Sequence, residues 1–161
     1  MSEVEAYNLF DGELQEDPKE PAGFCRRWQR FGQTLGAELL GMTVYELAPG
    51  ESVCPYHYEY DEEWVLILTG SPVLRDPDGE HELEAGDVVC FPVGPTGAHQ
   101  IFNRGGEPLR IAMLSTKGEP AVAVYPDSDK IGVWPGNPDD NLMLRRSDGA
   151  VGYYDGELRD Q

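Results

Sequence analysis

Short β-prone runs separated by frequent turn signals are the feature that most constrains the fold of this chain. The runs lie between Gly41 and Val124 and are rich in Val, Ile, Leu, Tyr and Phe. Turn signals interrupt them about every eight to twelve residues, for example at Pro49-Gly50, Thr69-Gly70 and Ala85-Gly86-Asp87. Each signal supplies a glycine that accepts a positive φ or a proline with a fixed φ. This rhythm predicts an all-β barrel or sandwich with little helix.

The expected strands follow from the positions of these runs. We expect them at 41–48, 52–58, 63–69, 72–76, 81–84, 87–91, 99–103 and 108–115, with further strands near 24–31 and 121–125. The segment Asp76-Pro77-Asp78-Gly79 predicts a hairpin between two of them, because Pro presets one turn residue and Gly accepts the other.

The chain divides into three expected parts. Residues 1–40 are expected to form an N-terminal arm with an edge strand, and residues 41–125 the barrel. Residues 126–161 are rich in Asp, Gly and Pro and predict an irregular C-terminal tail. Val133-Trp134 and Tyr153-Tyr154 would anchor this tail on the barrel or on a partner subunit.

Composition narrows the function. The 161 residues suit one domain, and 30 acidic against 12 basic residues give a formal charge of −18. Such a charge repels phosphate backbones and anionic lipids, so we expect no nucleic-acid or membrane partner and look for function in a pocket. No secretory signal or spanning apolar run is expected. Three cysteines without a CxxC pair favour reduced thiols in the cytoplasm.

Four residues suggest a metal site: His57, Glu59, Glu63 and His99. The first three share one parity, so a single strand would point them to one face, provided that residues 60–62 add no bulge. Two carboxylates about 4 Å apart repel by roughly 4 kcal/mol at an effective dielectric of 20, and a divalent cation between them relieves this repulsion. The mixed nitrogen and oxygen set favours Fe, Mn or Zn.

Other interpretations of the same residues stay open. His57 and Glu59 also suit solvent-facing positions on a strand in an acidic stretch, because an isolated His-x-Glu pattern is weak. Cys54 is expected to be a core or strand residue and not a ligand. Asp61 and Glu62 are expected to be loop acids.

Two motifs then resemble those of the cupin superfamily. The first family motif runs Gly, five residues, His-x-His, three or four residues, Glu, six residues, Gly, and the chain has Gly50, six residues, His57-x-Glu59, three residues, Glu63, six residues, Gly70. The second runs Gly, five residues, Pro-x-Gly, two residues, His, three residues, Asn. The chain has Gly86, five residues, Pro92-x-Gly94, four residues, His99, three residues, Asn103.

The resemblance implies an antiparallel double-stranded β-helix, that is, a jelly-roll or cupin barrel, of the kind found in small single-domain bacterial cupins. It places His57, Glu63 and His99 at three family ligand positions, with Glu59 where the family usually has a second histidine. One divalent metal ion is implied.

The resemblance also implies a function. We expect a metal-binding protein, a small metal-dependent enzyme of the dioxygenase, decarboxylase or isomerase type that acts on a small organic molecule in the barrel. The alternative is a non-catalytic module that binds a sugar or a carboxylic acid, since cupin barrels host both. No residue outside the ligand set identifies itself as catalytic. Exposed sheet edges and the aromatic tail favour a homodimer.

Overall fold

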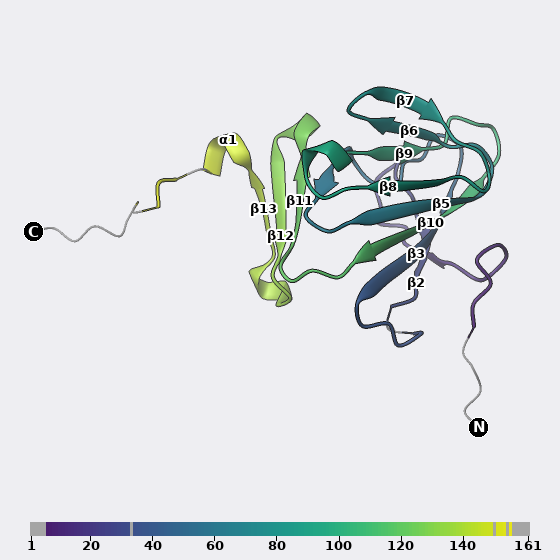
Figure 1. The fold of residues 1–161 in the computed structure, drawn as a ribbon, viewed down its shortest axis with the longest axis horizontal. Coiled ribbons are helices and arrows are strands. Elements are labelled where there is room, and N and C mark those ends of the chain that lie inside the picture. Colours follow the sequence, from purple (N-terminus) through teal and green to yellow (C-terminus); the bar gives the residue numbers. More distant parts are fainter. Residues whose placement is uncertain (1–5, 33, 150, 154, 156–161) are drawn as a thin grey trace, which may run out of the picture.

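The fold consists of antiparallel strands in three sheets (Figure 1). The computed structural model describes residues 6–32, 34–149, 151–153 and 155. The largest sheet has six strands, in the order β1 (Gln15–Glu16), β2 (Arg27–Arg30), β3 (Leu40–Leu47), β10 (Leu109–Thr116), β5 (Glu63–Thr69) and β8 (Val88–Phe91). A three-stranded sheet contains β7 (Gly79–Glu82), β6 (Val73–Asp76) and β9 (Gln100–Phe102).

The third sheet has four strands, in the order β13 (Leu142–Arg145), β12 (Lys130–Trp134), β11 (Ala121–Tyr125) and β4 (Tyr58–Glu59). Short helical turns complete the described chain: η1 (Pro95–Gly97), η2 (Pro126–Ser128), η3 (Pro138–Asp140) and α1 (Arg146–Gly149). None of the helices in the described part of the chain is long and apolar enough to cross a bilayer.

The hydrophobic core lies between the six-stranded and three-stranded sheets. Ile67 and Ile111 of the larger sheet belong to the same buried cluster as Leu74 and Ile101 of the smaller one. Residues that alternate along antiparallel strands therefore point inward from both layers, as in a two-sheet barrel. The expected all-β antiparallel fold is confirmed.

The predicted hairpin is also confirmed. Strands β6 and β7 pair, with Asp76 opposite Gly79. The Asp76 carboxylate accepts hydrogen bonds from the backbone N–H groups of Asp78 (2.8 Å) and Gly79 (3.0 Å). Gly79 has φ 142°, which side chains rarely adopt, so the glycine is required at this position.

The prediction of one strand over 52–58 is wrong. This segment makes isolated bridges at Ser52 and His57, and regular pairing starts only at β4. Pro55 interrupts it, because proline has no N–H for the ladder. The residues after β4 then carry the chain from the four-stranded sheet into β5 of the six-stranded sheet. Residues 57 to 63 therefore do not form the single strand on which the parity argument depended.

The prediction of an irregular tail is also wrong for much of 126–161. Strands β11 and β12 form a hairpin that pairs from Ala121 with Trp134 to Tyr125 with Lys130, and β13 pairs with β12. Val133-Trp134 lies on β12, Tyr153 is exposed, and Tyr154 lies outside the described residues. Because β11 also pairs with β4, this sheet is joined to the barrel beside the candidate site. The boundaries at residues 40 and 125 stay a prediction.

Candidate metal centre

The two histidines of the candidate site face each other across a backbone bridge. His57 immediately precedes β4 and His99 immediately precedes β9. The His57 N–H donates to the His99 carbonyl (3.1 Å), and the His99 N–H donates to the His57 carbonyl (2.8 Å). This pairing brings the two imidazole centroids to 4.8 Å from each other. Residues 42 positions apart in the chain thus present their rings to one point.

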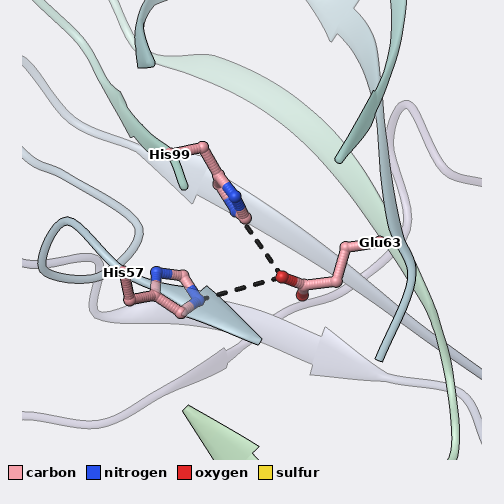
Figure 2. Close-up of side chains that lie close together, drawn as sticks. All are labelled: His57, Glu63 and His99. Atoms are coloured by element: carbon pink, nitrogen blue, oxygen red, sulfur yellow. Dashed lines mark ion pairs between the residues drawn. The ribbon is translucent and has the colours of Figure 1, made fainter. Parts of the chain in front are cut away.

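Glu63, the first residue of β5, completes a three-residue cluster. Its Oε2 lies 3.8 Å from Nε2 of His57 and 3.6 Å from Nε2 of His99. Figure 2 shows the carboxylate pointing between the two rings. One ligand atom from each of the three residues lies within 4.8 Å of the others, and both histidines are buried. The predicted trio His57, Glu63 and His99 is therefore brought together.

Each imidazole is oriented by a backbone carbonyl two residues before it. Nδ1 of His57 lies 3.0 Å from the Pro55 oxygen, and Nδ1 of His99 lies 2.9 Å from the Gly97 oxygen. A carbonyl only accepts hydrogen bonds, so each Nδ1 carries the proton. The lone pair of a neutral ring is then on Nε2, which faces Glu63.

His99 Nε2 provides the sharpest test of whether these residues suit a metal. It is buried and has no hydrogen-bond partner among the described residues. A buried polar atom without a partner is costly and needs an explanation. An unprotonated nitrogen aimed at a carboxylate and a second imidazole is the arrangement that a divalent ion requires, so the donor set fits Fe, Mn or Zn.

Burial and neighbouring charges shift the pKa values of the three residues in different directions. Burial disfavours the charged form of His57, but contact with Cys54 and the carboxylates of Glu59 and Glu63 outweighs burial and raises the pKa of His57 from 6.5 to about 11. Burial and the nearby Glu59 carboxylate raise the pKa of Glu63 from 4.5 to about 7, although the His57 cation opposes this shift. Without a metal, His57 is thus the cation that compensates the carboxylates.

His99 has the opposite shift. Burial and the charge of His57 lower its pKa from 6.5 to about 3, against the effect of its hydrogen bond to the Gly97 carbonyl. His99 is therefore neutral at physiological pH, and its Nε2 needs no deprotonation to bind a metal.

Glu59 lies next to the trio but outside it. Its Oε1 is 3.5 Å from Nε2 of His57, and its side chain is 27% exposed against 12% for Glu63. Asp61 and Glu62 lie elsewhere, since Asp61 accepts a hydrogen bond from the Thr116 hydroxyl and Glu62 accepts one from Trp64. The sequence interpretation of these two as loop acids agrees with those contacts. Ligation by Glu59 stays a prediction.

Two aromatic residues that the sequence did not single out cover the histidines. The Phe91 ring stacks on His99 with centroids 3.7 Å apart and an interplanar angle of 9°. The Tyr125 ring lies against His57 with centroids 5.8 Å apart. Phe91 pairs with Glu63 between β8 and β5, so alternation along the second motif offered a signal for it. Tyr125 is positioned by the pairing of β11 with β4, and the sequence contains no signal for that pairing.

Cys54 is not part of the trio, but it contacts the site. Its Sγ lies 3.4 Å from Nδ1 of His57, the nitrogen that does not face Glu63. The sulfur therefore lies beside the Pro55 carbonyl that orients the same ring. The cluster of candidate ligands in the described chain does not include Cys54, but the expectation of a core or strand residue is wrong, because Cys54 is half-buried and lies outside the strands.

The two carboxylates open into a polar cavity of about 650 Å³. This volume is in the range of small-molecule sites. The cavity is lined mostly by polar residues of β1, β2, β3, β4, β5 and β10 and of the segments that flank them: Gln15, Gln29, Arg30, Gly32, Thr34, Gly41, Met42, Thr43, Tyr45, Glu59, Glu63, Ser115 and Lys117. A small polar molecule in this cavity would reach Glu59 and Glu63.

Comparisons with known proteins agree with the fold and the motifs. Residues 43–115 match the family model described as "Cupin domain". A relative, Tetracenomycin polyketide synthase protein TcmJ from Streptomyces glaucescens, is 35% identical over 94 residues, which are 58% of this chain and 62% of that protein. The match thus spans less than two thirds of the length of that relative.

Two solved structures have a similar fold. One is a provisionally named sugar phosphate isomerase from Acidithiobacillus ferrooxidans, with 26% identity, a TM-score of 0.72, and coverage of 86% of this chain and 83% of that one. The other is a sugar phosphate isomerase from a cupin superfamily, from Silicibacter pomeroyi, with 24% identity, a TM-score of 0.76, and coverage of 92% and 98%. With the two motifs and the antiparallel barrel, these matches show that residues 43–115 form a cupin domain and that the chain has the cupin fold.

Proposed function

We propose that the protein is a metal-dependent enzyme that acts on a small organic molecule, with His57, Glu63 and His99 as ligands of one divalent ion. The observation that carries this proposal is the buried, unpartnered Nε2 of His99, which faces a carboxylate and a second imidazole within 4.8 Å. Orientation of both rings through Nδ1 is the usual support for metal-binding histidines.

We propose Glu59 as a fourth ligand. Its carboxylate approaches the same Nε2 of His57 as Glu63 does, at 3.5 Å and 3.8 Å respectively. Two carboxylates near one point are stabilised by a divalent cation, and two glutamates would neutralise its charge. Because Glu59 is the more exposed of the two, we expect it to bind more weakly than Glu63.

The reaction class follows from the ligand set and the cavity. Two histidines and one or two carboxylates leave coordination positions open, and Fe, Mn or Zn fits such a set. When bound, the ion would supply Lewis-acid polarisation of a substrate oxygen. The residues of the chain would orient the substrate in the cavity. Among dioxygenation, decarboxylation and isomerisation, we favour isomerisation, because the relative with 26% identity is provisionally named a sugar phosphate isomerase.

Metal analysis tests this proposal. Protein purified without an affinity tag is expected to contain about one Fe, Mn or Zn ion per chain. Inductively coupled plasma mass spectrometry measures this metal content. His99→Ala is expected to lose the ion, and Glu59→Gln to keep it with lower affinity. His81→Ala is the matched control, because His81 is the remaining histidine and lies on the surface, paired with Asp76 at 3.1 Å.

Two results decide between the functions. Folded wild type that takes up no divalent ion after incubation with Fe, Mn or Zn overturns the metal proposal. Metal-loaded protein that binds sugars or carboxylic acids without converting them favours the alternative, a non-catalytic binding module. Conversion of an aldose phosphate to a ketose phosphate that stops on chelation and returns with the ion supports the enzyme.

The molecular setting is proposed as well. We infer a homodimer, because the outer strand β13 exposes Leu142, Met143 and Leu144, each by about half. The formal charge of −18 supports the absence of nucleic-acid and membrane-surface partners. Three free cysteines, Cys25, Cys54 and Cys90, support a cytoplasmic location, where thiols stay reduced.

A further inference from the structure

Two cations line the cavity beside the two carboxylates. Arg30 and Lys117 both contribute to its wall, together with Glu59 and Glu63. The chain has only 12 basic residues against 30 acidic ones, so two of them in one cavity is a concentration of positive charge. Several other arginines of the described chain are neutralised by ion pairs, namely Arg27, Arg75, Arg104, Arg110 and Arg145. No ion pair among the described residues involves Arg30 or Lys117.

The sheet register places Arg30 on the same face as Glu63. Glu63 of β5 pairs with Ser115 of β10, and Ser115 pairs with Gly41 of β3. Thr43 lies two residues further along β3, on the same face as Gly41, and pairs with Arg30 of β2. Three strand steps of roughly 4.8 Å separate β5 from β2, and the offset of two residues adds roughly 7 Å along the strands, so the two residues lie roughly 16 Å apart in the sheet. Arg30 therefore lies at the end of this cavity wall away from the carboxylates.

Each cation is held in place and keeps donors free. The Arg30 guanidinium lies over the Trp28 ring, 5.1 Å from its centroid. This contact uses the flat face of the group and leaves its N–H edge free. Nζ of Lys117 donates one hydrogen bond to the Ala37 carbonyl, at 2.8 Å. An ammonium has three donors, so two remain.

We propose that Arg30 and Lys117 form an anion-binding subsite, and that the ligand of this cavity is a small molecule with a phosphate or carboxylate group at one end. The other end carries the oxygen that approaches Glu59, Glu63 and the proposed ion, so this inference rests on the proposed function. Phosphate and carboxylate share the chemistry that recognises them here: two or more acceptor oxygens that match the fork of an arginine and the point charge of a lysine.

Charge across the whole molecule makes such a subsite necessary for an anionic ligand. A chain with a formal charge of −18 repels anions at long range. At the inner end, His57, Glu59, Glu63 and His99 with a divalent ion would carry no net charge, so they would offer little attraction for a second anionic group. Cations at the other end supply that attraction and fix the direction in which the ligand enters.

Calorimetric titration of the metal-loaded protein tests the subsite. The probes are a hexose phosphate, a hexuronate and an uncharged hexose, each titrated into wild type, Arg30→Gln and Lys117→Met. Each substitution is expected to weaken binding of the anionic probe about tenfold or more, because it removes a charge-assisted hydrogen bond. Binding of the uncharged hexose is expected to change by less than about twofold in the same variants.

Two control variants separate local recognition from the overall charge. Arg26→Gln removes an arginine near β2, and Lys19→Met removes a lysine of the arm, while neither residue lines the cavity. Both controls are expected to bind the anionic probe as wild type does. An equal loss in the controls and in the cavity variants overturns the subsite, because it shows a long-range charge effect.

The metal content of every sample is measured alongside. Loss of hexose phosphate binding alone assigns the subsite to phosphate, and loss of hexuronate binding alone assigns it to carboxylate. Metal-loaded wild type that binds neither anion overturns this inference and leaves the proposed metal site standing. Wild type that takes up no metal overturns the proposed function itself.

Discussion

In the metal-free site, a proton on His57 compensates the negative charge of the carboxylates, as a bound metal ion would do in the loaded site. The pKa of His57 is raised from 6.5 to about 11, so its contribution to stability is complete below pH 6.5 and is lost as the pH rises through 11. The pKa of Glu63 is raised to about 7, so its contribution is complete below pH 4.5 and is lost as the pH rises through 7. The lowered pKa of His99, about 3, acts in the opposite sense and offsets the Glu63 effect up to pH 6.5, so the metal-free protein is expected to lose stability as the pH rises above 6.5.

Metal binding should therefore release a proton. At pH 8, where Glu63 and His99 are already deprotonated, an ion can bind His57 only after its imidazolium loses a proton. We expect release of about one proton per ion and an affinity that rises about tenfold per pH unit. Titration calorimetry in two buffers of different ionisation enthalpy measures this release, and His81→Ala should give the same value. An affinity that does not change between pH 7 and 9 would contradict the expectation.

At the scale of elements, the site depends on the short turn η1, which positions the carbonyl that orients His99. Gly97 ends this turn, and its carbonyl oxygen lies 2.9 Å from Nδ1 of His99. A Cβ at residue 97 would overlap the backbone carbonyl of Pro92. Backbone atoms cannot move aside as a flexible side chain can, so the turn must shift and take the carbonyl with it.

Gly97→Ala is accordingly expected to damage stability and metal binding together. We expect a loss of about 2 kcal/mol or more in the free energy of unfolding, from overpacking against the backbone. Metal affinity should fall as well, since His99 loses its orienting partner. Gly106→Ala is the matched control, because a Cβ there meets nothing within 4 Å. Denaturant unfolding and metal titration of both variants measure the effects, and a Gly97→Ala protein that behaves like the control would contradict this account.

The sequence predicts the strands that local residue patterns mark, and it misses the strands that only pairing with other strands stabilises. The bounds of β5 and β11 match their expected ranges, because local alternation and turn residues mark both. Strands β12 and β13 carry no such mark. In β12, Gly132 interrupts the alternation, because the Trp134 ring fills the space that a side chain at residue 132 would need. In β13, all four residues are exposed. Pairing with β11 stabilises β12, pairing with β12 stabilises β13, and such strand pairing leaves no local pattern in the sequence.

The site shows the same division. His57, Glu63 and His99 were predictable, because two spaced motifs placed them in one barrel. Phe91 and Tyr125, which cover the rings, depend on strand register, and the carbonyls that hold the rings belong to the backbone and have no sequence signature. The cationic end of the cavity depends on register too, since it joins β2 to the end of β10.

At the scale of the whole molecule, the four-stranded sheet lies at one end of the barrel, with β13 at its margin (Figure 1). Strand β13 pairs with β12 on one side and with no other strand of the described chain. Its apolar side chains are about half exposed on both faces: Leu142, Met143 and Leu144. An apolar edge strand with free backbone groups pairs readily with another chain. A second copy with the same edge would satisfy both edges about a twofold axis.

Light scattering during size-exclusion chromatography tests this dimer. Wild type is expected at twice the chain mass of 17.9 kDa. The double variant Met143→Lys with Leu144→Lys places a charge on each face of β13 and is expected to run at the mass of one chain, since charges on an edge strand oppose pairing. Phe10→Lys is the control, because Phe10 is another exposed apolar residue but lies outside the sheets. A wild type with the mass of one chain, or a dimer that survives both lysines, would show that β13 is not the interface.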